Sequence, residues 1–282
     1  MNADNLMKEI NFFRKRWPHY ESILNFYGQI FLAQENSRPR IGIQPFNISG
    51  NDVSGRNNKF LPLIKVDEFA IDEEQAGLLL EKLISIAQPA HKEVAVPAET
   101  IGKALKNKKI DASSLFSDFL KSDKSYFKEI EESYDINCNT LSFLIYNSIK
   151  PSLSACAQKL TKGLPEKHGW NSGTCPVCGS APVLSLFGEG GKRFLVCSFC
   201  WHTWPVQRIY CSFCQNQDTT TLRYYFSDQK DEYRIDVCNK CKYYIKSLDQ
   251  REIERIIYPP LENIATPHLD LKAMELGFRN IL

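Results

Sequence analysis

Eight of the ten cysteines in this chain lie in four Cys-x-x-Cys pairs within one stretch of 67 residues. The pairs are Cys175/Cys178, Cys197/Cys200, Cys211/Cys214 and Cys238/Cys241. Eight thiolates are enough for two closed four-sulfur metal sites. A segment of this size buries too little apolar surface to fold well alone, and a structural metal ion adds on the order of 10 kcal/mol of stability. The pattern therefore predicts a metal-built region, in which the ions hold the fold.

The segments between the pairs predict how the pairs combine. The first two pairs are separated by 18 residues, a spacing typical of zinc ribbons, and the last two by 23, which is slightly long. Each segment has a strand–turn–strand pattern, over 182–196 and over 221–237. Each hairpin then carries one Cys-x-x-Cys turn, here called a knuckle, at either end. We therefore predict one ion held by the first two pairs and a second ion held by the last two; an interleaved cross-brace, as in RING-like domains, is the alternative.

Other uses of the cysteines fit the sequence less well. A disulfide network needs an oxidising compartment, whereas the first residues, 1–5, lack the apolar stretch of a secretory signal. A thioredoxin-type redox site uses one Cys-x-x-Cys pair at a strand–helix junction. His202 follows Cys200 closely and is a competing ligand, but eight cysteines already complete two sites. Cys138 and Cys156 lie on expected helices and are interpreted as small core residues. We expect metal ligation in the reducing cytoplasm.

The rest of the chain predicts an α+β protein: an N-terminal all-helical domain, two tandem rubredoxin-like or zinc-ribbon β modules and a short C-terminal helix. Apolar residues at helical spacing begin with Leu6, Ile10 and Phe13 and recur to about residue 160. The predicted boundaries are a helical domain over 1–160, a linker over 161–174, a first ribbon over 175–204, a second ribbon over 205–246 and a C-terminal helical segment over 247–282.

Two helices are expected in the C-terminal segment. The first runs from Ser247 to Ile257 and is ended by Pro259. The second is framed by Thr266 as N-cap and by Gly277 beyond its end.

Composition and motifs narrow the function. The chain has 282 residues and a formal net charge of +2, and no apolar run approaches the length of a membrane span. Residues 175–242 hold eight Lys and Arg against six Asp and Glu, which is less basic than a typical nucleic-acid-binding ribbon. No phosphate-binding loop, nucleophile elbow or His-Glu-x-x-His helix is present. We expect a protein that is not an enzyme and that binds neither membrane nor nucleic acid.

The residues around the knuckles go beyond a generic ribbon. They resemble the FdhE family, the formate dehydrogenase accessory proteins, in four segments and in the closing helix. The stretches are 175–182 (CPVCGSAP), 193–200 (RFLVCSFC) with Trp204, 208–214 (RIYCSFC), 233–246 (YRIDVCNKCKYYIK) and 265–277 (ATPHLDLKAMELG). Between Cys200 and Trp204 this chain has Trp201-His202, where the resemblance leads us to expect small or acidic residues. This departure changes what surrounds the first metal site and leaves its four cysteine ligands unaffected.

The resemblance implies a cytoplasmic factor for the maturation of formate dehydrogenase that binds the catalytic subunit of that enzyme. It also implies rubredoxin-like sites in which all eight paired cysteines are ligands, with one iron or zinc ion per site; tetrahedral sulfur suits both metals. Two alternatives remain open from the sequence: a nucleic-acid-binding zinc ribbon, and a rubredoxin-like electron carrier.

Overall fold

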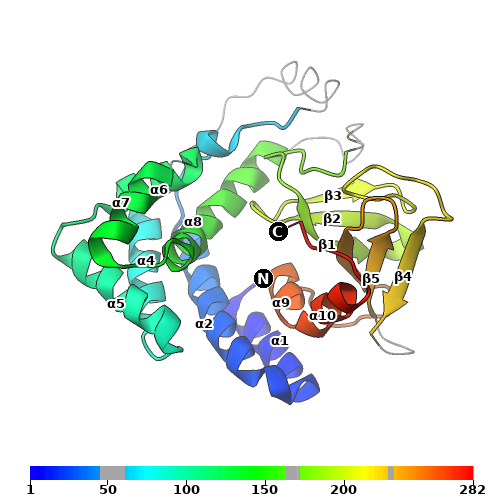
Figure 1. The fold of residues 1–282 in the computed structure, drawn as a ribbon, viewed down its shortest axis with the longest axis horizontal. Helices are drawn as coiled ribbons and strands as arrows, with labels where there is room; N and C mark the ends of the chain where they lie inside the picture. The colour runs from blue at the N-terminus through cyan, green and yellow to red at the C-terminus, as the bar shows by residue number, and fades with distance from the viewer. Residues whose placement is uncertain (45–60, 123, 163–169, 171, 228–231, 282) are drawn as a thin grey trace. The chain divides into compact units, whose positions relative to one another are not determined.

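The computed structural model describes residues 1–282 except 45–60, 123, 163–169, 171, 228–231 and 282. The described residues form two compact units (Figure 1). Residues 1–44 and 65–159 make a helical unit, and residues 61–64 and 160–281 make a unit built on a β-sheet. The predicted α+β class, with helices first and the cysteine-bearing strands after them, is confirmed. Most of the predicted linker, 161–174, lies outside the described residues.

The helical unit forms where apolar residues recur every three to four positions. In the first helix Leu6, Ile10 and Phe13 are fully buried, and Asn2 caps the helix by accepting a hydrogen bond from the backbone N–H of Asn5. α1 packs on α2, α2 on α4 and α4 on α5. The helices are α1 (Ala3–Arg16), α2 (Glu21–Ser37), α4 (Glu73–Ala87), α5 (Lys92–Lys106), α6 (Ala112–Lys121), α7 (Lys124–Tyr134) and α8 (Cys138–Thr161), with short 3-10 turns η1 (Pro18–Tyr20), η2 (Arg38–Arg40) and η3 (Val66–Glu68).

A lysine is buried in the middle of this unit. Lys150 of α8 is 6% exposed, and its ammonium lies 5.0 Å from the centre of the Phe31 ring. Burial lowers the pKa of Lys150 to about 7, the charge of Arg38 adds to the shift and Glu35 opposes it. Folding therefore carries the cost of a buried charge at neutral and acidic pH.

This burial predicts a pH-dependent stability. Because the pKa of Lys150 is lower in the folded than in the unfolded chain, the unfolded chain binds more protons between about pH 7 and the ordinary lysine value, and stability rises with pH across that window. We expect Lys150→Met to stabilise the protein by about 1–4 kcal/mol at pH 7 and to flatten this rise. Thermal melting at pH 6.5 and pH 9 measures both effects, and an equal pH dependence in the two proteins would contradict the assignment.

The second unit is organised by one six-stranded sheet with the order β3-β2-β1-β6-β5-β4 (Figure 1). β1 (Pro182–Phe187) and β2 (Arg193–Cys197) are the first predicted hairpin, and β4 (Leu222–Phe226) and β5 (Tyr233–Cys238) are the second. β3 (Thr203–Val206) and β6 (Tyr244–Asp249) each follow a hairpin and pair with its second strand. The turn of the first hairpin contains η4 (Glu189–Gly191).

The two ribbons are thus repeats of one pattern: knuckle, strand, strand, knuckle, strand. They join through β1 and β6, which pair in parallel with Ser185 opposite Ser247. All other strand pairs in the sheet are antiparallel. The ribbons therefore share one continuous sheet, because the first strand of one repeat satisfies the free edge of the third strand of the other.

The structure corrects the prediction of a helix over 247–257. The chain stays extended in β6 to Asp249, and the next helix, α9 (Pro259–Ile264), begins at the prolines instead of ending there. β6 lies between β1 and β5, and five of its six residues are buried. Sheet pairing on both sides overrides a helical pattern, whereas proline at the first helical positions favours a start.

The C-terminal helices are tied to the sheet by buried polar side chains. Tyr233 of β5 donates a hydrogen bond to Glu262 of α9 at 2.5 Å, and Glu262 is fully buried. Lys246 of β6 pairs with Asp270 at 2.8 Å, on the predicted last helix α10 (Pro267–Glu275). Figure 1 shows α9 and α10 beside the strands, and α10 contacts both β5 and β6.

Across the part of the chain that is described, we find no helix with both the length and the apolar character needed to cross a membrane.

Candidate metal centres

The first group of sulfur atoms lies at the start of β1 and the end of β2. Strand β2 ends at Cys197, and its antiparallel partner β1 starts just after the knuckle of Cys175 and Cys178. The sulfurs of Cys178 and Cys197 lie 3.5 Å apart, and Cys200 lies 3.7 Å from both Cys175 and Cys178. All four residues are buried. The backbone N–H groups of Phe199 and Cys200 point at the Cys197 sulfur, at 3.3 and 3.4 Å.

The second group repeats this arrangement in the second ribbon. The sulfurs of Cys211 and Cys241, and those of Cys214 and Cys238, are each 3.7 Å apart. Here Cys214 and Cys241 are only half-buried. The structure therefore groups the pairs consecutively, in two sets of four, and not in the interleaved alternative. His202 belongs to neither set among the described residues.

The geometry of both groups fits a tetrahedral ion. Four sulfurs placed about 2.3 Å from a shared zinc ion lie about 3.8 Å from one another, close to the observed separations. A disulfide needs a separation of about 2 Å, and all ten cysteines are free. Burial raises the pKa of Cys175, because a thiolate is disfavoured away from water. Four thiolates this close together therefore need a bound cation to balance their charge. Each set offers four ligand atoms of the kind that iron and zinc accept.

Each knuckle is shaped by one residue in the left-handed backbone region. That residue always follows the second cysteine of the pair. It is Gly179, with φ +77°, in the first knuckle, and Trp201, Gln215 and Lys242, with φ between 61° and 63°, in the other three. In the first, third and fourth knuckles the turn is closed by a backbone hydrogen bond from this residue to the first cysteine, as from Gly179 to Cys175 at 2.9 Å. Only the first knuckle has the glycine that accepts this conformation without strain.

Gln215 offers a test of that strain. Its side chain is exposed and its φ is 61°, a conformation that costs about 1–2 kcal/mol for a residue with a Cβ. We expect Gln215→Gly to stabilise the metal-loaded protein by about 0.5–1 kcal/mol, since the relief exceeds the added entropy of the unfolded chain. The reverse change, Gly179→Ala, should destabilise. Urea unfolding at constant metal content checks both signs, and a loss of stability in Gln215→Gly would contradict the interpretation.

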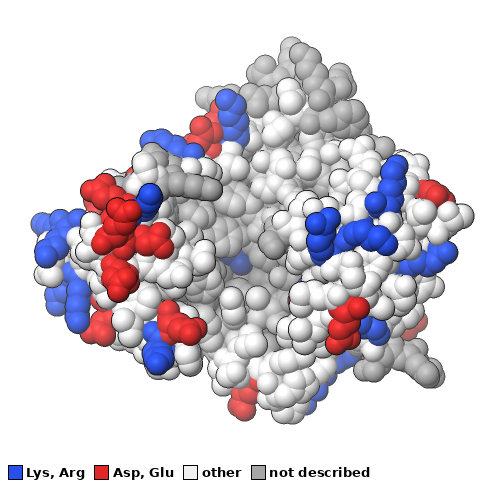
Figure 2. Space-filling view, viewed as in Figure 1, with Lys and Arg blue, Asp and Glu red and all other residues white. Residues whose placement is uncertain are grey.

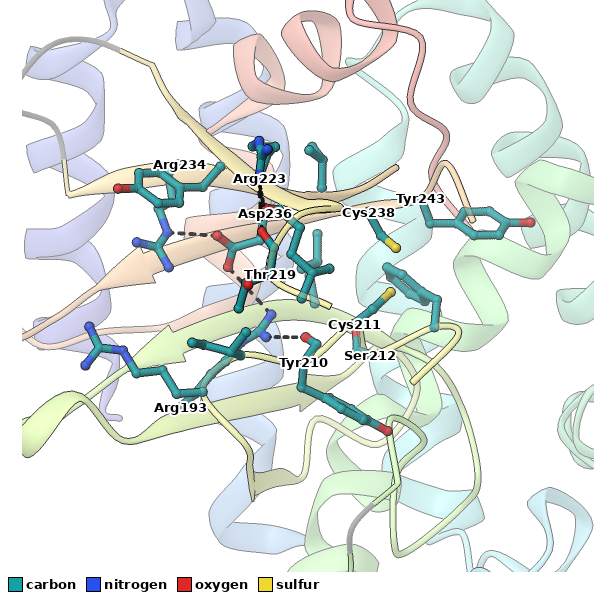
Figure 3. A pocket seen from close by; sticks show the side chains of 17 residues that line it. Arg193, Tyr210, Cys211, Ser212, Thr219, Arg223, Arg234, Asp236, Cys238 and Tyr243 are labelled. Carbon is teal, nitrogen blue, oxygen red and sulfur yellow. Dashed lines mark hydrogen bonds and ion pairs between the residues drawn. The ribbon is translucent and has the colours of Figure 1, made fainter. Parts of the chain in front are cut away.

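A buried arginine, which the sequence reasoning did not identify, joins the two ribbons. Arg193 of β2 is 4% exposed, donates to Ser185 of β1 at 2.8 Å and to the carbonyl of Tyr210 at 2.6 Å, and lies 3.6 Å from Asp236 of β5. Figure 3 shows Asp236 between Arg193 and Arg234, with which it pairs at 2.9 Å. The only sequence signal was a charged residue at the start of an otherwise apolar strand, 193–197.

The remaining two cysteines stand apart from both groups. Cys156 is buried in α8, and burial raises its pKa to about 11. Cys138, at the start of α8, donates a hydrogen bond to the Glu131 carboxylate at 3.0 Å. Burial raises the pKa of the Cys138 thiol to about 11, and the neighbouring Glu131 carboxylate adds to this shift. Both are protonated thiols at neutral pH and suit a structural role.

Comparison with known proteins agrees with this architecture. The family model described as "FdhE, central domain" matches residues 174–208, which contain the first sulfur group. The "Protein FdhE homolog" of Aquifex aeolicus is 28% identical over 278 residues, covering 96% of this chain and 90% of the relative. A homologue from Haemophilus influenzae is 26% identical, and the match spans about half the length of that relative, 55%.

A solved structure resembles the whole chain. The crystal structure of the FdhE protein from Pseudomonas aeruginosa covers 100% of this chain and 95% of its own, with a TM-score of 0.68. Its sequence identity of 18% makes this a likeness of fold. Together, the family model, the relatives and the fold confirm the resemblance predicted from the cysteine motifs.

Proposed function

We propose, from the likeness of this chain to the FdhE proteins, that it is an accessory protein for the maturation of formate dehydrogenase. In this role it acts in the cytoplasm without catalysing a reaction. It binds the catalytic subunit of the enzyme through the helical unit together with the sheet that carries the two sulfur groups. The observation that supports the proposal most is the pair of four-sulfur groups, set in a chain that matches an FdhE homologue over 96% of its length.

The proposed ligands are the eight paired cysteines, with one ion for each set of four. Iron and zinc both fit tetrahedral sulfur. Bound there, either ion would fasten the two ends of a hairpin together. The backbone N–H groups of Phe199 and Cys200 point at the Cys197 sulfur, and the left-handed residue after each second cysteine turns the chain tightly around the site. Elemental analysis of anaerobically purified protein identifies the metal and counts the ions per chain.

A binding experiment tests the accessory role. The tagged chain should retain the catalytic subunit of formate dehydrogenase from an extract of its own host cells, and deletion of its gene should lower formate dehydrogenase activity. Retention should also fall in a variant that lacks the first sulfur group. A deletion strain with undiminished activity, together with failure to retain the catalytic subunit, would reject the proposal.

An electron-carrier role is a second candidate because of the exposure of the second sulfur group. Cys214 and Cys241 are half-buried, so an ion there lies near solvent, as electron exchange with a partner requires. Ferric iron in sulfur ligation gives a visible absorption band that a reductant bleaches reversibly. A colourless protein that contains only zinc would exclude this candidate and leave the accessory proposal intact.

A further inference from the structure

A pocket opens beside the second sulfur group, entirely within the sheet unit. Its volume is about 460 Å³, within the usual range for small-molecule sites. The sulfurs of Cys211 and Cys238 lie on one side of it, and Arg234 and Asp236 lie on the other (Figure 3). Its walls come from the loop before the third knuckle and from β4, β5 and β6, so distant parts of the sequence form it.

Four arginines line this pocket, against one carboxylate, that of Asp236. Two of the four are held in place by the protein. Arg193 is bound to Ser185 and Tyr210, and Arg234 pairs with Asp236 while its guanidinium stacks 4.7 Å from the centre of the Tyr224 ring. These contacts fix the orientation of the two guanidinium groups, and the charge of Asp236 is balanced by them.

The other two arginines face the pocket from exposed positions. Arg223 of β4 donates to the backbone carbonyls of Thr219 and Leu222, and its charge helps to lower the pKa of the nearby Asp218 carboxylate, after the hydrogen bonds that Asp218 accepts from Thr220. Arg208 makes neither a hydrogen bond nor an ion pair with any residue that the structure describes. Figure 2 shows Lys and Arg side chains over the sheet unit on the face in view, with Asp and Glu side chains among them.

The second sulfur group adds negative charge beside the pocket when an ion is bound. A divalent ion bound to four thiolates carries a charge of −2 in total, and backbone N–H groups of Cys241 and Lys240 lie against the Cys238 sulfur. Among the residues that line the pocket, the four guanidinium groups exceed in charge the one carboxylate, that of Asp236. Arginine forks match the oxygens of phosphate and carboxylate groups. Beside them, Ile209 and Tyr224 are 54% and 57% exposed and offer apolar surface.

We propose that this pocket is a binding site for a small molecule that carries phosphate or carboxylate groups. Arg208 and Arg223 hold its anionic groups, and the side chains of Ile209 and Tyr224 cover its apolar body. A volume of about 460 Å³ favours a small molecule over an extended segment of a partner protein. This site is independent of the accessory function and makes no use of the helical unit.

Calorimetric titration of the metal-loaded full-length protein tests the site with three probes: inorganic pyrophosphate, ADP and citrate. We expect at least one to bind with a Kd in the micromolar to low-millimolar range, and the preference between phosphate and carboxylate probes identifies the anion. Arg208→Gln and Arg223→Gln should each weaken that binding about ten- to a hundredfold, the loss expected for hydrogen bonds to a charged group. Both side chains are exposed, so both variants should melt like the original protein.

Arg251→Gln is the matched control, because Arg251 is also exposed but pairs with Asp249 away from the pocket. It should bind the probes as the original protein does. The proposal is overturned if none of the three probes binds, or if the two pocket variants bind as well as the control. A site filled only by an acidic peptide of eight or more residues, with all small probes excluded, would also overturn it.

Discussion

Cys178→Ser is expected to remove the ion from the first sulfur group and to unfold much of the sheet unit. The Cys178 sulfur lies 3.5–3.7 Å from those of Cys197 and Cys200, so no other side chain can replace it in the tetrahedron. A structural ion contributes on the order of 10 kcal/mol, more than the whole stability of many domains. Metal content should fall from two ions per chain to one or fewer, and the melting transition of the sheet unit should be lost.

The effect should be smaller in the second group. Cys214 is half-buried, whereas Cys178 is 6% exposed, so Cys214→Ser leaves a site that solvent reaches more easily but that supports less of the core. Cys138→Ser is the control, because that thiol lies outside both groups and the variant should keep two ions. A Cys178→Ser protein with two ions and an unchanged melting temperature would contradict the ligand assignment. Plasma emission spectrometry and calorimetry on the same samples decide between these outcomes.

Gly173→Ala is expected to be the most damaging change outside the cysteines. A Cβ at position 173 would lie 1.7 Å from the carbonyl oxygen of Ser212 and 2.5 Å from its carbonyl carbon, both of them backbone atoms. Ser212 stands inside the third knuckle, so the clash would displace the chain that presents Cys211 and Cys214. We expect a loss of about 3 kcal/mol and weaker metal retention in the second group. Thermal melting and chelator competition measure the two effects.

Gly77→Ala provides the comparison for this prediction. Gly77 lies within α4, and nothing stands within 4 Å of a Cβ built there. Replacing a glycine inside a helix by alanine should stabilise by about 1 kcal/mol. The two Gly→Ala changes therefore have opposite expected signs. If Gly173→Ala left both stability and chelator resistance unchanged, the close approach of residues 173 and 212 would not exist in solution.

Local sequence patterns predicted the individual elements well. Asp72 caps α4 by accepting a hydrogen bond from the backbone N–H of Gln75, as an aspartate directly before an apolar helical run favours. Thr266 precedes α10 as predicted, but its hydroxyl donates back to the carbonyl of Glu262 instead of capping the new helix. Both hairpins also follow from their alternation and turn residues, because these signals act between residues close in sequence.

Long-range pairing could not be predicted from those patterns. The parallel pair of β1 and β6 joins residues about sixty positions apart, and it turns the predicted helix after residue 247 into a buried strand. Arg193 looked like an ordinary strand residue until the fold placed Ser185, Tyr210 and Asp236 around it. Periodicity reports which face of an element is apolar and not which element will cover it.

The spacing of the cysteines determined the most about this protein: two cysteines three residues apart turn toward one point, and a hairpin of suitable length returns the next two to it. Those constraints act between residues that are close in sequence, so they can be recognised from the sequence itself. Only the tertiary structure decided that the two ribbons share a sheet, that the first sulfur group is buried while the second is half open, and that four arginines surround one pocket beside it. These features depend on which surfaces meet, and that choice rests on packing and buried charge summed over the whole unit.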